Sequence, residues 1–152
     1  MRVIAILLGL LFGVFLLLTA VGALSDRAEI APDLRGRIAL AVVMAFTASG
    51  HFFQTGPMSR MLPPRVPLRV PLIYGTGLLE VAIAAALLVP RWSRPTGIFL
   101  IAYLIVIFPS NVYAAVKRVP MGGHAAGPKY LWVRAPLQLV LAAWTWWFAV
   151  RT

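Results

Sequence analysis

The sequence predicts an all-α integral membrane protein, a four-helix transmembrane bundle with one extra transmembrane helix at its N-terminus. Of its 152 residues, 61% are hydrophobic, and the mean hydropathy is +0.89. A soluble domain of this size needs more polar surface than this composition supplies. The hydrophobic residues also gather into runs that approach the roughly 20 residues of helix needed to cross a bilayer. Composition and the length of these runs together predict the fold class.

Five runs occur in order along the chain, and each is almost free of charge. Charged residues interrupt only the third run, at Glu80, and the fifth, at Arg134. The second run is short, so we expect Asp33 to cap a helix that begins at Leu34 and lengthens it. Arg35 should then extend its side chain to the lipid headgroups. The runs are Val3–Leu24, Ile38–Phe53, Pro71–Val89, Gly97–Val116 and Tyr130–Val150.

The runs divide the chain into two parts. Residues 1–24 are expected to form an N-terminal transmembrane helix, and residues 34–150 a four-helix transmembrane domain. The first run has a basic start, as a signal peptide does. Its apolar part is longer than the roughly 7–15 residues of a typical signal peptide, and further spans follow, so an uncleaved signal anchor is predicted. Gly9 and Gly13 have the GxxxG spacing that suits contact with a partner helix.

The connecting loops predict the topology. Prolines exclude a long helix from Gln54–Val70, and its mixture of apolar residues and arginines suits a lid lying on the membrane surface. Lys117–Lys129 is basic and glycine-rich, and its His124 is expected to be a solvated loop residue. Antiparallel helices place both loops on one side, opposite the turn Pro90–Thr96. The positive-inside rule assigns that side to the cytoplasm, which predicts a multi-pass protein with its N-terminus in the cytoplasm and its C-terminus outside.

Charge and cysteine content exclude several functions. The net charge of +10 would suit nucleic-acid binding, but no soluble basic face remains to carry it. Basic loops between apolar runs instead fit contact with anionic lipid. Cysteine is absent, which excludes disulfides, thiolate metal sites and dithiol relays within this chain. No metal site is predicted, and haem is disfavoured because His51 is the only histidine inside a span.

The polar residues inside the spans are predicted to converge on one pocket. A carboxylate in hydrocarbon is costly and by default marks a functional or partner-binding position. Helical spacing and antiparallel order place Glu80 near polar residues from the other spans. Pro109 interrupts its helix, which is tolerated where a helix lines a cavity. No catalytic residue is predicted; the predicted ligand-binding residues are His51, Tyr74, Glu80, Asn111, Arg134 and Gln138.

Arg134 is the expected partner of Glu80, because leaving either charge alone in hydrocarbon is costly. We therefore expect the two side chains to lie within salt-bridge distance. Two interpretations of such a pair stay open. It could be static and fix the register of the helices, or it could belong to a site that handles a ligand or a proton. Asn111 and Gln138 could likewise serve only to bond neighbouring helices.

Several short motifs stand out over residues 35–147. They are Ser49-Gly50-His51-Phe52, Met61-Leu62-Pro63-Pro64, Pro71-Leu72-Ile73-Tyr74-Gly75-Thr76-Gly77-Leu78-Leu79-Glu80, Leu88-Val89-Pro90-Arg91, Phe108-Pro109-Ser110-Asn111-Val112-Tyr113 and Leu131-Trp132-Val133-Arg134-Ala135-Pro136-Leu137-Gln138. Together they resemble the DoxX family of small bacterial integral membrane proteins. The resemblance implies a four-helix core in the bacterial cytoplasmic (inner) membrane, and it implies no catalytic residue. The family takes its name from a subunit linked to a quinol oxidase, and its relatives include thiosulfate–quinone oxidoreductase subunits and a methylamine-utilisation protein.

Three classes of function stay open, and the sequence does not decide whether the protein is an enzyme. The first is an accessory, redox-associated subunit whose pocket holds a lipophilic molecule such as a quinone. Arg134, His51 and Asn111 would then donate hydrogen bonds to quinone carbonyls, and Glu80 would relay a proton. The second is a small transporter or a proton or ion path, although no internal repeat supports it. The third is a membrane scaffold. The expected partners are the lipid bilayer, other membrane redox subunits and a second copy of the chain.

Overall fold

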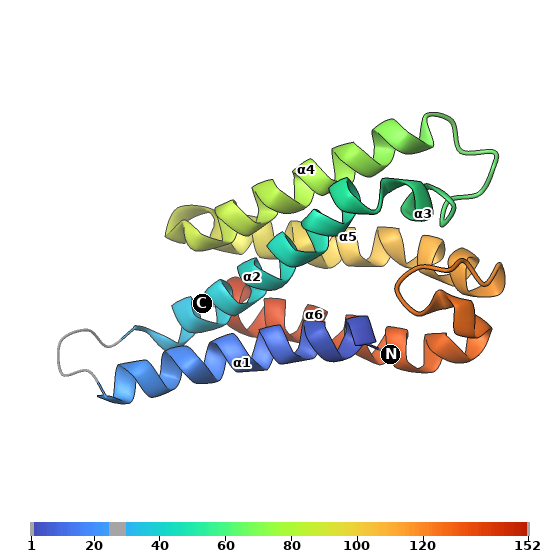
Figure 1. Ribbon diagram of the computed structural model, residues 1–152. Coiled ribbons are helices and arrows are strands. Elements are labelled where there is room, and N and C mark those ends of the chain that lie inside the picture. Colours follow the sequence, from blue (N-terminus) through green and yellow to red (C-terminus); the bar gives the residue numbers. More distant parts are fainter. Residues whose placement is uncertain (1, 25–29, 152) are drawn as a thin grey trace.

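The computed structural model describes residues 2–24 and 30–151, and helices make up nearly all of that part of the chain (Figure 1). Four helices are long and apolar enough to cross a membrane: α1 (Arg2–Leu24), α2 (Pro32–Phe53), α4 (Arg69–Leu88) and α5 (Pro90–Val116). A further helix, α6 (Leu131–Thr145), continues directly into a π-helical turn, η2 (Trp146–Val150). Two short segments lie in the connections: α3 (Thr55–Ser59) and the 3-10 segment η1 (His124–Tyr130). The predicted all-helical class with several helices of spanning length is confirmed.

The helices form an antiparallel bundle (Figure 1). α4 and α5 lie on one side, α1 and α6 on the other, and α2 crosses between them. α2 contacts α1, α4 and α6. The N-terminus, α3 and η1 gather at one end of the bundle, whereas the α4–α5 connection and the C-terminus lie at the other. The two basic connections therefore share one end, which we call the basic end.

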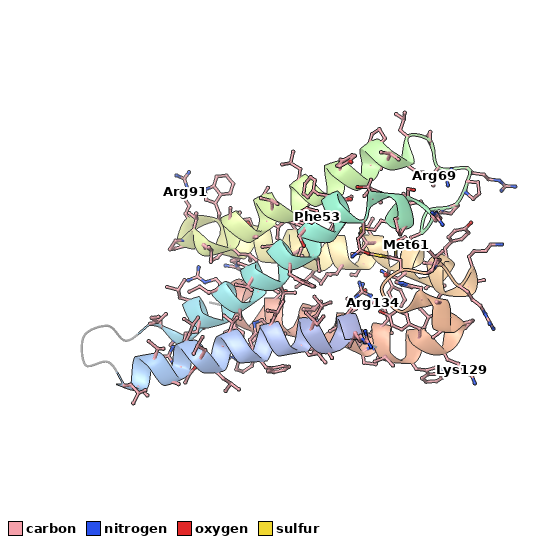
Figure 2. The ribbon with its side chains drawn as sticks, viewed as in Figure 1. Phe53, Met61, Arg69, Arg91, Lys129 and Arg134 are labelled. Atoms are coloured by element: carbon pink, nitrogen blue, oxygen red, sulfur yellow. The ribbon has the colours of Figure 1, made fainter. Side chains whose placement is uncertain are left out.

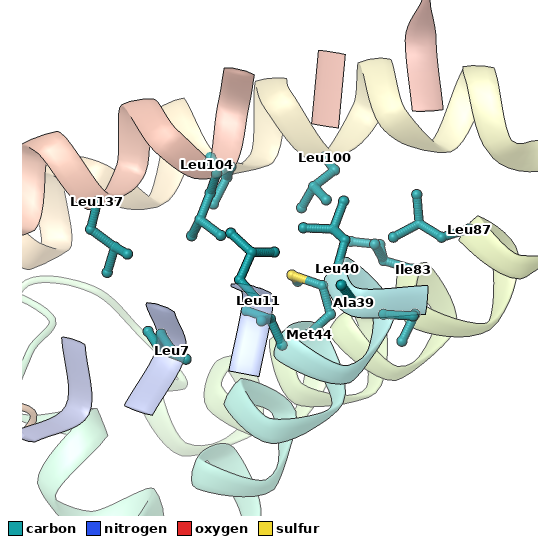
Figure 3. Close-up of a cluster of buried hydrophobic side chains, with 14 of the residues drawn as sticks. Leu7, Leu11, Ala39, Leu40, Met44, Ile83, Leu87, Leu100, Leu104 and Leu137 are labelled. Atoms are coloured by element: carbon teal, nitrogen blue, oxygen red, sulfur yellow. The ribbon is translucent and has the colours of Figure 1, made fainter. Parts of the chain in front are cut away.

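A layer of buried leucines packs between the helices (Figure 3). Leu40, Leu87 and Leu100 come from α2, α4 and α5, and all three are fully buried. Leu7 and Leu11 add α1 to the same core. The buried residues of α1 are Ile4, Leu7 and Leu11, so this helix packs into the core through its first half.

Two helices begin earlier than expected, and a proline stands at each start. α2 begins at Pro32, not Leu34, and no side chain caps it. Asp33 lies in the first turn, where a carboxylate interacts favourably with the helix dipole. α5 begins at Pro90, so the expected turn over residues 90–96 is instead the start of a helix. Proline is tolerated at the first helical position because the N–H that it lacks would be unpaired there anyway.

Arg35 is buried and does not extend towards a headgroup. Only 8% of the residue is exposed, and its Nε donates a hydrogen bond to the Ile30 carbonyl at 2.6 Å. A Cβ added to Gly22 of α1 would lie 3.2 Å from the guanidinium. The arginine therefore joins the end of α1 to the start of α2.

The shared basic end can be tested by labelling, because the chain has no native cysteine. Figure 2 shows Arg69 and Lys129 at the basic end and Arg91 at the other. We expect a membrane-impermeant maleimide applied to intact cells to modify Arg91→Cys and to spare Ser59→Cys. Both variants should react after permeabilisation. The reverse pattern would place the basic end outside, against the positive-inside rule.

Candidate functional site

The site begins where α2 and α4 touch at Gly77. A Cβ at this position would lie 2.6 Å from the Cβ of His51, which is closer than two such atoms approach. Only glycine therefore permits this spacing between the helices. Glu80 follows Gly77 by three residues and lies near the same face of α4. The contact brings an imidazole and a carboxylate to one buried place.

His51, Glu80 and Tyr103 form a connected polar cluster. His51 Nε2 lies 3.5 Å from Glu80 Oε1, and the Tyr103 hydroxyl donates a hydrogen bond to the same oxygen at 2.8 Å. All three residues are buried, with Glu80 only 4% exposed. Three helices thus meet at one carboxylate oxygen. The other oxygen, Oε2, is buried with no hydrogen-bond partner among the described residues.

The partners of the second ring nitrogen of His51, Nδ1, show which nitrogen carries the proton of the neutral imidazole. Nδ1 is 3.0 Å from the Ile73 carbonyl and 3.0 Å from Thr76 Oγ1. Because a carbonyl only accepts, Nδ1 must carry a proton. A neutral imidazole would then present a bare lone pair from Nε2 to the Glu80 carboxylate. One proton between Nε2 and Oε1 removes that repulsion, and it makes the His51–Glu80 pair neutral overall.

Arg134 does not form the expected ion pair with Glu80. Within residues 2–24 and 30–151, the ion pair that Glu80 makes is with His51. Arg134 Nε is buried and has no hydrogen-bond partner in that part of the chain. α4 packs mainly on α2 and α5, whereas α6 packs on α5 and α2. The prediction was wrong because the helices that carry the two charges are not direct neighbours.

A second histidine, His124, lies in the same region. The prediction that it is a solvated loop residue was wrong. His124 is only 3% exposed. Its Nδ1 lies 2.7 Å from the Met121 carbonyl, and its Nε2 lies 3.2 Å from Asn111 Oδ1 on α5. Burial lowers the pKa of His124, and the positive charge of Arg134 lowers it further, while the bond to the Met121 carbonyl opposes both. The imidazole is thus held in its neutral form over a wider pH range than in water.

Two consecutive glycines explain how this loop residue becomes buried. Gly122 and Gly123 have φ angles of 61° and 109°, a region that side chains with a Cβ rarely adopt. They turn the chain back towards the bundle. Tyr130 then packs edge-on against the His124 ring at 4.7 Å between centroids, and its hydroxyl donates to the Gly122 carbonyl at 2.7 Å.

These side chains lie at the polar end of a cavity of about 490 Å³. That volume falls within the roughly 300–1,000 Å³ of small-molecule sites. Its walls are mainly apolar and come from all five long helices, and Met58, Met61 and Leu62 of the α2–α4 connection also contribute. The leucine layer of residues 40, 87 and 100 does not line the cavity. The polar end is formed by His51, Glu80, Tyr103, Asn111, His124 and Arg134.

Four of the six predicted pocket residues line this cavity: His51, Glu80, Asn111 and Arg134. Tyr74 does not, because it is 45% exposed and packs against the Phe52 ring. Tyr74 precedes Glu80 by six residues, which leaves the two about 120° apart around a helix of 3.6 residues per turn. Gln138 does not line the cavity either. Its Nε2 donates to the Leu104 carbonyl, and its Oε1 is buried without a partner among the described residues.

The fold and the cavity define an all-helical protein with several helices of membrane-spanning length and a buried polar site. The chain belongs to the family described as a domain of unknown function, DUF8561, whose model matches residues 40–149. The resemblance to the DoxX family was therefore wrong. No curated protein and no solved structure matches the chain. The matched residues include the polar end of the cavity and leave out α1.

Replacing Gly77 by alanine should loosen the contact between α2 and α4. The added Cβ would meet His51 at 2.6 Å, and overpacking of this kind costs about 1–3 kcal/mol. We expect a lower midpoint of thermal unfolding in detergent, followed by tryptophan fluorescence. Gly75→Ala is the matched control, because a Cβ there meets nothing within 4 Å. Equal midpoints for the two variants would contradict the close contact.

The burial of His124 predicts a pH dependence. Because its folded pKa is lowered, the unfolded chain binds more protons below the ordinary histidine pKa of about 6.5. Stability should be fully present above that pH and should be lost as the pH falls towards the lower folded pKa. Thermal unfolding measured across this range should show a shallower loss in His124→Gln than in the wild type. Parallel curves would show that His124 does not contribute.

Proposed function

We propose that the protein resides in a membrane and binds a lipophilic small molecule in the cavity between its helices. The observation that carries the proposal is a largely apolar cavity with unpartnered polar atoms at one end, Glu80 Oε2 and Arg134 Nε. Buried polar groups are normally hydrogen-bonded, and leaving one unpaired costs about 1–3 kcal/mol. The polar head of a ligand would supply partners there, and the apolar walls would contact its body.

Membrane residence is supported by the outer surface as well as by helix length. Large apolar side chains point outwards along all five long helices, including Leu16 of α1, Phe46 of α2, Leu78 of α4, Val106 of α5 and Leu139 of α6. Apolar patches of this extent on a soluble protein would favour aggregation or a partner, whereas lipid tails would cover them directly. The basic end would face the cytoplasm, and a bacterial inner membrane is the expected location.

Binding fits the cavity better than transport does. The polar residues of the cavity lie in the half of the bundle near the basic end. The other half holds the leucine layer, and the buried polar side chains that the structure describes there, which are Arg35, Ser93, Thr96 and Thr145, do not line the cavity. A path for an ion or a proton would need a polar cavity that continues through that half.

A quinone is one specific ligand that this cavity would suit. Arg134 Nε–H would donate to a quinone carbonyl, and Glu80 Oε2 would accept from a quinol hydroxyl. The proposal rests on these two unpartnered atoms and on the apolar walls alone. Association with other membrane subunits or with a second copy stays a separate prediction.

Filling the cavity should abolish binding. Gly50 lines the cavity, and a Cβ there meets only the Met58 sulfur, at 4.0 Å. Gly50→Leu should therefore occupy the cavity without a clash at Cβ. Gently purified wild-type protein should carry a lipophilic molecule in stoichiometric amount, measured by extraction and mass spectrometry, and Gly50→Leu should carry much less.

Gly75→Leu serves as the control, because Gly75 is exposed on α4 and does not line the cavity. It should retain the same molecule as the wild type. Equal retention by both variants, or an empty wild-type protein, would contradict binding in this cavity.

A further inference from the structure

The charges at the polar end of the cavity do not balance. The proton that lies between His51 Nε2 and Glu80 Oε1 makes that pair neutral. His124 supplies no negative charge in either protonation state, and Tyr103 and Tyr130 carry no charge as hydroxyls. Asp33 is the only other acid that the structure describes, and it lies at the opposite end of α2, about 27 Å from His51 at 1.5 Å per residue. Among the described residues, Arg134 is therefore a guanidinium with no carboxylate within salt-bridge distance, and Glu80, the acid that acts on it from farther away, already pairs with His51.

The geometry of Arg134 fits an anion that is not part of the chain. Its side chain points from α6 into the interior of the bundle (Figure 2), and it lines the cavity. Its Nε is buried with no partner in the described part of the chain. A buried charge is very costly unless it is paired and hydrogen-bonded. A guanidinium presents a planar fork of N–H groups that matches the two oxygens of a carboxylate.

Asn111 and Ser110 also line the cavity, but both are neutral and both already donate to a backbone carbonyl. The second N–H of the Asn111 amide carries no charge with which to balance an anion. Asn111 Nδ2 donates to the Ile107 carbonyl at 3.2 Å, and Asn111 Oδ1 faces His124 Nε2. The Ser110 hydroxyl also donates to the Ile107 carbonyl, at 2.6 Å. Glu80 does not repel an incoming anion, because His51 already neutralises it. Among the described residues, the buried donor that is left without a partner at this end of the cavity is Arg134 Nε.

We propose that Arg134 binds the carboxylate head of a single-chain lipophilic acid whose apolar chain fills the rest of the cavity. This inference rests on the proposed function and narrows its ligand to one class. The apolar walls give no preference for charge. The preference for an acid over a neutral molecule of the same length would come from Arg134 alone.

The test compares hexadecanoic acid with hexadecanol, which have the same chain and differ in the charge of the head. Each is added to the purified full-length protein in uncharged detergent at about pH 8, where a carboxylic acid in water is ionised. Bound molecules are counted by native mass spectrometry. The wild type should bind the acid about tenfold or more tightly than the alcohol, as expected for hydrogen bonds to a charged group.

Variants then assign the preference to Arg134. Arg134→Gln should remove it and Arg134→Lys should reduce it, because lysine keeps the charge and loses the fork. Arg94→Gln should keep it, because Arg94 is exposed at the other end of the bundle. The acid–alcohol comparison on the wild type needs no variant, so it decides the question even if Arg134→Gln is unstable.

Other outcomes separate this inference from the proposed function. Equal binding of acid and alcohol, both lost in Gly50→Leu, would overturn the carboxylate and keep the lipophile site. Tighter binding of hexadecyl phosphate than of the acid would overturn the choice of carboxylate as the head group. Binding of neither molecule, or binding that survives in Gly50→Leu, would overturn both proposals.

Discussion

The close contact between α2 and α4 at Gly77 is the constraint on which the site depends. It sets the distance between the two helices, and so it decides whether His51 can reach Glu80. A buried carboxylate without a partner would be strongly unfavourable in these surroundings. The missing Cβ of one residue therefore allows Glu80, the one acid that is buried among the described residues, to be neutralised. Tyr103 then completes the cluster from α5.

The sequence predicted the class of fold and the end of the bundle that carries the site, but it did not predict the partners within that site. The class of fold follows from the long apolar runs, which are a matter of composition. The end of the bundle that carries the site follows from the antiparallel order of the helices. Partner choice depends on which helices adjoin. α4 lies beside α2 and α5 and not beside α6, so Glu80 met His51 and Tyr103 in place of Arg134. No spacing within one helix contains that information.

The second wrong prediction about the site concerned a loop residue, His124. His124 was expected to be solvated because it follows two glycines in a basic loop, yet those glycines turn the loop back into the bundle. The two adjacent glycines, with Tyr130 following in the sequence, were the available indication that the loop turns back and buries His124. The mistaken family resemblance has a related cause. Small and polar residues recur in apolar helices because close packing and hydrogen bonding require them, so short motifs of this kind arise in unrelated chains.

The position of α1 has a consequence for how such a cavity can diversify. Val3 and Leu7 line the cavity, yet both lie outside the residues that match the family. The polar end and part of the apolar wall are therefore contributed by separate segments of the chain. If the cavity binds a ligand as we propose, substitutions in α1 would change the length or thickness of the ligand that fits and would leave the head-group contacts untouched. Recognition of the head and selection of the tail could then diverge independently during evolution.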